Sequence, residues 1–195
     1  MGGEFVQEVK EYVKELGGRA KASKLSFPSI EELKKTGEAV TSNGRLEKGK
    51  MYVFRYFTPA EQMYDTYPVV IGLGMSDDGH QLGINLHYIP YDTRLQFVQN
   101  FKDSYMGSIA ESTIGFYSFN AQAQLPINIV DYKSIKRAFG KKYNITYAIR
   151  QYSLKRMRKP LVLSYENWKV AVVNDENFFN GTNINEAQSK FFANI

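Results

Sequence analysis

The stretch from Gly49 to Asn100 decides the fold, and it reads GKMYVFRYFTPAEQMYDTYPVVIGLGMSDDGHQLGINLHYIPYDTRLQFVQN. Runs of alternating or apolar residues over 50–57, 69–75 and 81–89 predict three β-strands. The turn sequence Asp-Asp-Gly at 77–79 joins the second strand to the third as a hairpin. The stretch therefore predicts a small antiparallel β-core, an SH3-like barrel or a similarly compact arrangement.

An amphipathic helix follows the third strand directly. Asp92 is a good N-cap residue for a helix over 93–105, and Gly107 ends that helix. Its apolar side chains recur at helical spacing and form one stripe: Leu95, Val98, Phe101 and Tyr105. We expect this stripe to lie on the β-core.

The strand periodicity also predicts which side chains share a face. In the first strand one set of residues alternates with another, Met51, Val53 and Arg55 against Tyr52, Phe54 and Tyr56. In the second strand Gly72 and Gly74 share a face, and this spacing indicates the close approach of a neighbouring backbone or side chain. The pair is no phosphate loop, because it lacks the third glycine of a dinucleotide motif and the lysine of a P-loop.

The residues before the core predict an N-terminal helical extension over 1–48. The first helix, over 4–16, ends at a Gly-Gly pair, and its apolar stripe consists of Phe5, Val9, Tyr12, Val13 and Leu16. A second helix begins at Ser29, where Glu32 completes a capping box. With no internal repeat or low-complexity linker in the chain, we expect residues 49–195 to form a single α+β domain.

The last part of the chain has weaker signals. Residues 108–130 predict a loop with at most short structure, and a short helix is expected over 131–139. Further strands are expected over 145–152, 161–165 and around 168–173, and residues 174–195 predict a loop with a short terminal helix.

Composition narrows the class of protein. Hydrophobic residues make up 43% of the chain and aromatic residues 14%, which indicates a folded protein rather than a disordered one. The absence of cysteine excludes disulfides and thiolate metal sites, and two histidines are too few for a histidine-rich site. No secretory signal is recognisable, and no apolar run reaches the roughly 18 residues that span a bilayer. We expect a soluble protein without metal, cofactor or membrane partner.

Positive charge is concentrated in one segment. Between Tyr132 and Pro160 the sequence has ten of the 25 basic residues and no acidic one. The rest of the chain has 15 basic and 20 acidic residues. This basic block comprises Lys133, Lys136, Arg137, Lys141, Lys142, Arg150, Lys155, Arg156, Arg158 and Lys159. The overall charge of +5 therefore comes from one positive segment on an otherwise acidic chain.

The basic block has two interpretations. Interleaved with tyrosines, it can neutralise nucleic-acid phosphates and offer stacking faces. Alternatively, it meets the acidic face of a partner protein or is a solvated surface. Nothing in the block is typical of base-specific readout, so phosphate contacts that position the protein are the expected mode of any nucleic-acid binding.

No catalytic constellation is recognisable, and we expect no enzymatic activity. His87 is expected on the polar face of a strand, where a structural hydrogen bond or a partner contact accounts for it. His80 lies beside a turn glycine, and Asp77 and Asp78 are explained by turn chemistry. A nuclease would need several carboxylates converging on a metal, for which the sequence offers the candidates Asp65, Asp92 and Asp103.

Five short segments carry a family resemblance. They are GKMYVFRY at 49–56, YDTYPVV at 64–70, LGINLHYIP at 82–90 running into Arg94, IRQYS at 149–153, and WKVA at 168–171 followed by Phe178. The most specific piece is Gly83-x-Asn85-x-His87-Tyr88, and Trp168 belongs to the same structural signature. These segments resemble a family of virion proteins from T4-like tailed bacteriophages, often labelled DNA end protector. The sequence departs from the family pattern after Tyr56, where the family has a longer and more basic segment.

The resemblance implies a non-enzymatic structural or assembly component at the head–neck–tail region of a virion, assembled in the host cytoplasm and present in multiple copies. Its expected partners are portal, neck, tail or baseplate subunits and double-stranded DNA, whose packaged ends it would bind or protect. Two alternatives stay open, a tail or baseplate assembly protein that contacts only proteins, and a DNA-processing nuclease or its accessory protein.

Overall fold

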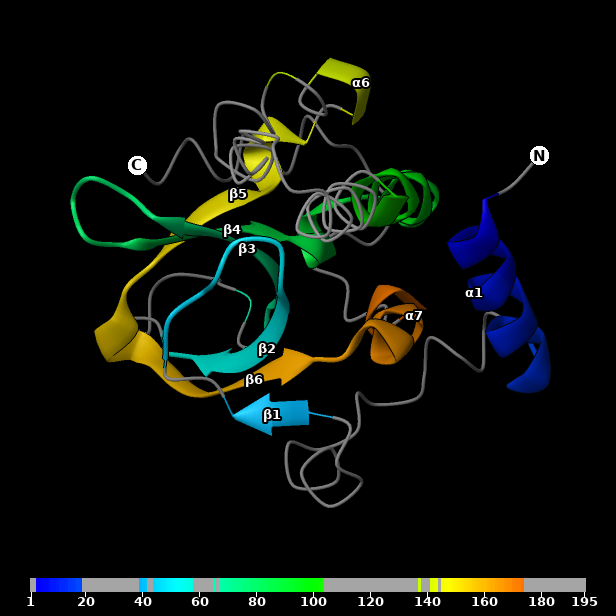
Figure 1. Ribbon diagram of the computed structural model, residues 1–195, viewed down its shortest axis with the longest axis horizontal. Helices are drawn as coiled ribbons and strands as arrows, with labels where there is room; N and C mark the ends of the chain where they lie inside the picture. Colours follow the sequence, from blue (N-terminus) through cyan, green and yellow to red (C-terminus); the bar gives the residue numbers. More distant parts are fainter. Residues whose placement is uncertain are drawn as a thin grey trace, which may run out of the picture.

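The computed structural model describes residues 3–18, 39–41, 44–57, 65, 67–103, 137, 141–143 and 145–173. They contain a six-stranded antiparallel sheet in the order β1-β6-β2-β3-β4-β5 (Figure 1). The strands are β1 (Ala39–Thr41), β2 (Met51–Tyr56), β3 (Val69–Met75), β4 (Gln81–Asn85), β5 (Ile149–Tyr152) and β6 (Met157–Leu163). The α-helices are α1 (Glu4–Glu15), a helix over 91–103, α6 (Lys141–Tyr143) and α7 (Trp168–Val173). The predicted α+β class is therefore confirmed.

The centre of the sheet is the predicted β2-β3-β4 unit. Its close-approach glycine is Gly72, where an added Cβ would lie 2.3 Å from the backbone oxygen of Glu47. Gly74 has a left-handed backbone with φ of 92° and marks a register shift between β3 and β4. Both positions exclude larger side chains, as the spacing of the two glycines predicted.

The sheet curls strongly without closing. β5 and β6 are consecutive in sequence but pair with β4 and β2 respectively, and the one-turn 3-10 helix η5 (Leu154–Arg156) connects them. Across the curl the rings of Tyr56 and Tyr152 lie 5.2 Å apart, and the Ser153 backbone N–H donates to the Tyr56 hydroxyl at 3.2 Å. β1 and β5 remain its two edges, so within the described strands an SH3-like barrel is not confirmed.

Each face of the sheet buries its own core. The concave face holds Tyr52, Phe54, Tyr56 and Tyr152, with Leu46, Val70 and Met157. The other face buries Met51 and Val53 in a core shared with α7 and the helix over 91–103, and α1 packs on the outer side of these two helices (Figure 1). This division follows the alternation predicted for β2. Each large apolar side chain buried in this way contributes about 2 kcal/mol to folding.

The helices that cover the second face were largely predictable. In α1, Phe5 and Val9 are fully buried, and Tyr12, Val13 and Leu16 pack against the same core, as the helical stripe predicted. In the helix over 91–103, the stripe residues Leu95, Val98 and Phe101 are buried. Tyr105 lies outside the described residues. No helix in the described part of the chain is long and apolar enough to cross a membrane.

Three sequence predictions are corrected. The expected strand around 168–173 is the helix α7, in which Trp168, Ala171 and Val172 are buried at helical spacing. The third strand stops at Asn85, because the Asn85 side chain accepts the His87 N–H at 3.0 Å and turns the chain into the 3-10 helix η1 (Leu86–Tyr88). Residues 146–148 likewise form the 3-10 helix η4 (Thr146–Ala148) before β5 begins.

The strand predicted over 161–165 begins earlier and ends earlier than expected. β6 covers Met157–Leu163, so part of the basic block lies within the sheet. The predicted helices from Ser29 and over 131–139, the loop over 108–130 and the C-terminal segment 174–195 fall outside the described residues, apart from Arg137.

Candidate nucleic-acid interface

The basic block does not form one continuous surface. Its side chains that the structure describes as exposed are Arg137, Lys142, Lys155, Arg156, Arg158 and Lys159. Lys141 belongs to α6, and Lys133 and Lys136 lie outside the described residues. Figure 1 places α6 apart from η5, so the exposed cations of the segment 155–159 form a group of their own.

A bulge in β6 places two exposed cations of this group next to each other. Arg55 pairs with Arg158 and Val53 with Leu161, so the two residues 159–160 of β6 stand opposite one residue of β2. Lys159 takes a left-handed backbone with φ of 49°, which is uncommon outside glycine. The bulge breaks the in-and-out alternation of the strand, and Arg158 and Lys159 are both exposed.

The pairing of β2 with β6 brings two residues from a distant part of the sequence, Arg55 and Phe57, next to these cations. The Phe57 backbone N–H donates to the Arg156 carbonyl oxygen at 3.1 Å, which fixes Phe57 beside η5. The Arg55 guanidinium carbon lies 4.5 Å from the centre of the Phe57 ring, and that of Arg158 lies 5.9 Å from it. Phe57 is 44% exposed although it is apolar. We call Arg55, Phe57, Lys155, Arg156, Arg158 and Lys159 the basic corner.

Four cations of the basic corner have no ion pair within the described chain. None of the described ion pairs includes Arg55, Lys155, Arg156 or Arg158. The Arg158 guanidinium instead donates to the carbonyl oxygens of Lys155, at 2.7 Å, and Met157, at 3.1 Å, which holds its position. A fixed cluster of uncompensated cations attracts a polyanion.

Arg150 differs from the other described cations of the block. It is buried, and its guanidinium carbon lies 4.2 Å from the centre of the Tyr88 ring. A buried guanidinium stacked on a tyrosine stabilises the fold and does not reach a phosphate outside the molecule. Arg150 is therefore left out of the interface.

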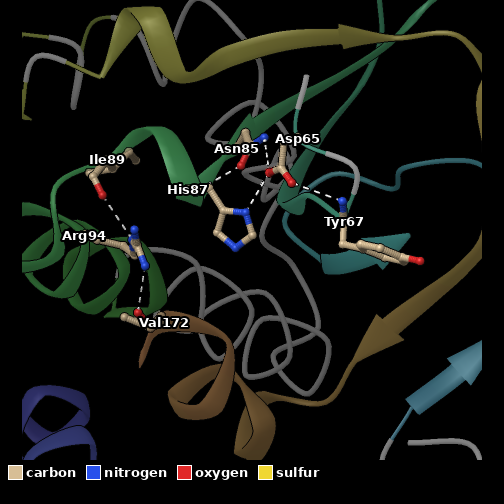
Figure 2. A network of polar contacts seen from close by, with 7 residues as sticks. All are labelled: Asp65, Tyr67, Asn85, His87, Ile89, Arg94 and Val172. Atoms are coloured by element: carbon tan, nitrogen blue, oxygen red, sulfur yellow. Dashed lines mark hydrogen bonds and ion pairs between the residues drawn. The ribbon is translucent and has the colours of Figure 1, made fainter. Parts of the chain in front are cut away.

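Two residues of the structural signature, Asn85 and His87, meet Asp65 in a buried polar network (Figure 2). The Asp65 carboxylate lies 2.6 Å from His87 Nδ1, accepts the Asn85 side-chain amide at 3.0 Å and accepts the Tyr67 backbone N–H at 3.1 Å. These contacts tie the segment at 65–67 to the end of β4 and to η1. Sequence reasoning named Asp65 only as a candidate metal ligand and missed this role, because its partners lie some twenty residues further along the chain.

Asp65, Asn85 and His87 are all nearly inaccessible, so the hydrogen bonds among them lie inside the protein, away from any ligand outside. His87 Nε2 is also buried and has no hydrogen-bond partner among the described residues. Burial raises the pKa of the nearby Tyr152 phenol well above its ordinary value, and the negative charge of Asp65 raises it further. Tyr152 therefore stays neutral in the core. The candidate carboxylates do not converge on a metal: within the described residues no group of three His, Asp or Glu side chains could hold one.

The other signature residues have packing roles. An added Cβ at Gly83 would lie 2.1 Å from a Val70 methyl carbon, so β4 needs glycine there. Trp168 stacks on Phe101 and packs against Tyr165, joining α7 to the helix over 91–103. Arg94 connects the same elements, because its guanidinium group donates to the carbonyl oxygens of Ile89 and Val172 (Figure 2).

The fold and its surface thus define a small basic α+β protein with an exposed cationic corner and a buried polar network. A family model described as Phage T4 terminal DNA protecting protein matches residues 1–145, and the chain belongs to this family. The resemblance found in the sequence is confirmed. Neither the curated proteins nor the solved structures include a match. The match covers Arg55, Phe57 and the Asp65 network and ends before β5.

Proposed function

We propose that this chain is a non-enzymatic structural component of a phage virion that binds the ends of double-stranded DNA and protects them. Membership of a family of terminal DNA protecting proteins supports DNA ends as the ligand. The single observation that carries the proposal for this molecule is the basic corner, whose cations are all exposed. Arg55, Lys155, Arg156 and Arg158 also have no ion pair in the described chain. We propose a place at the head–neck–tail region, in multiple copies beside portal, neck or tail subunits, after assembly in the host cytoplasm.

Contacts with phosphates would supply most of the affinity. Arg55, Lys155, Arg156, Arg158 and Lys159 are five exposed cations on one corner. Five phosphate contacts give a slope of about −4.5 for log K against log salt, which is a loss of roughly 500-fold over a fourfold rise in salt. Such contacts hold the protein on DNA of any sequence.

Fluorescence anisotropy of the whole chain on a blunt duplex, at low and physiological salt and without divalent metal, tests the proposal. The variant Lys155→Glu with Arg156→Glu reverses two charges of the basic corner. We expect it to weaken binding more than tenfold and to reduce the salt slope by about 2. A matched control, Lys10→Glu with Lys14→Glu, makes the same charge change at exposed positions of α1, on the opposite side of the molecule (Figure 1). The control should bind like the unaltered chain.

Digestion of a linear duplex by a purified exonuclease is the second arm. Protection by the unaltered chain and its loss in the Lys155→Glu, Arg156→Glu variant would support the proposed role. The proposal is wrong if the unaltered chain binds no duplex at low salt or leaves the ends as sensitive as before.

An assembly or baseplate protein that meets only proteins is the second candidate. The observation in its favour is that Leu154 and Phe57, two exposed apolar residues, lie among the cations, as in interfaces with an acidic protein. A nuclease or its accessory is the remaining alternative, and it would cleave DNA when a divalent metal is added. Co-purification with virion subunits without DNA binding would support the first of these alternatives, and metal-dependent cleavage would support the second.

A further inference from the structure

We propose that the Arg55–Phe57 pair is a stacking platform for the terminal base pair of a duplex, which makes the protein selective for ends over continuous DNA. This inference rests on the proposed function and adds to it the residues and the physical basis of end recognition. It starts from Phe57, the residue that follows β2, which is 44% exposed and has the guanidinium of Arg55 over its ring.

The pair has the chemistry that nucleobases stack on. Bases stack on aromatic rings and on the planes of arginine guanidinium groups. The distance of 4.5 Å from the Arg55 guanidinium carbon to the centre of the Phe57 ring puts both kinds of surface in one unit. The other exposed aromatic residue in the described chain is Tyr67, and no guanidinium lies over its ring within the described residues.

A stacking platform distinguishes ends from the rest of a duplex. Every internal base pair is covered on both faces by its neighbours, and only the last pair of a linear duplex exposes a face. Stacking on that face needs no unpairing and no readout of base edges, so it is independent of sequence. A duplex whose ends are closed offers no such face, so only contacts with its phosphate backbone would remain.

The surroundings of Phe57 suit this geometry. Its backbone N–H is bonded to the Arg156 carbonyl oxygen, so the ring is anchored at the corner where η5 meets β6. The bulge with the left-handed Lys159 backbone exposes Arg158 and Lys159 together beside it. A non-glycine residue in that conformation costs of order 1 kcal/mol, and such strain is often kept where it positions a functional side chain. Cations around the platform can reach the phosphates nearest the end.

The test compares two forms of one duplex. One form is linear and blunt, and in the other both ends are closed by hairpin loops of the same chain. Anisotropy at fixed low salt gives the ratio of the two affinities. The unaltered chain should prefer the open form by about tenfold, the contribution of one stacked base. Phe57→Ala should bring the ratio of the two affinities close to one. Phe57→Trp should retain the preference, and Phe57→Leu, which is apolar without a π-face, should lose it.

Met75→Ala is the matched control, because Met75 is another exposed apolar residue near a strand end, 61% exposed at the end of β3. It should leave the ratio unchanged. The stacking platform is refuted if Phe57→Ala keeps the preference or weakens both forms equally, and the proposed DNA binding would survive that result. Failure of the unaltered chain to bind either form would instead refute the proposed function.

Discussion

A single carboxylate organises the polar interior. The Asp65 carboxyl group accepts the Asn85 side-chain amide and the Tyr67 backbone N–H, and it lies 2.6 Å from the His87 ring nitrogen Nδ1. Removing one acceptor from such a network strands several buried donors at once. That loss is more costly than the loss of one hydrogen bond between exposed groups.

Asp65→Ala is therefore expected to lower the free energy of unfolding by about 3 kcal/mol. Urea denaturation followed by circular dichroism measures this loss. Asp77→Ala, at an exposed turn position, is the control and should change stability by less than about 0.5 kcal/mol. A loss below about 1 kcal/mol for Asp65→Ala would mean that the network does not hold this segment.

The three carboxylates that the sequence offered to a metal have unrelated surroundings. Asp65 lies in the buried network, and Asp103 accepts the Gln99 amide on its own helix. Asp92 is exposed near the start of that helix. The residue types were visible in the sequence, but their distances were not, because no local pattern relates positions so far apart.

Among the elements, α1 decides whether the N-terminal extension is an appendage. The sequence predicted an extension over 1–48, and that division is still a prediction. Phe5 and Val9 of α1 are fully buried in the same core as α7 and the sheet. The packing favours a helix that unfolds together with the β-core.

Phe5→Ala should lower the free energy of unfolding by about 3 kcal/mol in one cooperative transition, because it removes a fully buried ring and leaves a cavity. Denaturation monitored by both Trp168 fluorescence and helical circular dichroism measures it. Glu11→Ala, on the exposed side of α1, serves as the control. Loss of helical signal while the Trp168 transition stays in place would show an independent appendage.

β6 shows why strand limits were hard to predict. The strand was predicted over 161–165, which begins after Pro160, a residue without an N–H for a ladder. In the sheet, residues 159–160 form the bulge, where no backbone N–H of residue 160 is needed for the ladder. The strand therefore extends back to Met157. The segment 168–173 was misjudged because its β-branched residues favour strands, whereas packing on the core selected a helix.

At the scale of the molecule, the curled sheet buries phenols that resist ionisation. Burial raises the pKa of Tyr147 to about 12, and burial together with Asp65 raises that of Tyr152 well above its ordinary value. The unfolded chain ionises its tyrosines near pH 10. Stability from these two phenols is therefore fully present below about pH 10 and falls as the pH rises further, because the unfolded state loses protons first.

The double variant Tyr147→Phe, Tyr152→Phe should show a flatter decline of stability between about pH 9 and pH 11 than the unaltered chain. Urea midpoints across that range measure it. A Tyr67→Phe variant, at a residue that is 42% exposed, is the control and should keep the original slope. Equal slopes in the double variant and the unaltered chain would contradict the assignment of the alkaline loss to these buried phenols.

The sequence by itself determined the β2-β3-β4 unit, α1, the helix over 91–103, the turn glycines, the segregation of charge and the family. These features depend on side-chain period, turn residues and short motifs, all of which are local. Only the tertiary structure decided that β6 pairs with β2, which joins Arg55 and Phe57 to the cations of 155–159, and that Arg150 is buried while its neighbours in the block are exposed. Strand partners and burial arise from contacts between distant segments, and a linear pattern does not contain those contacts.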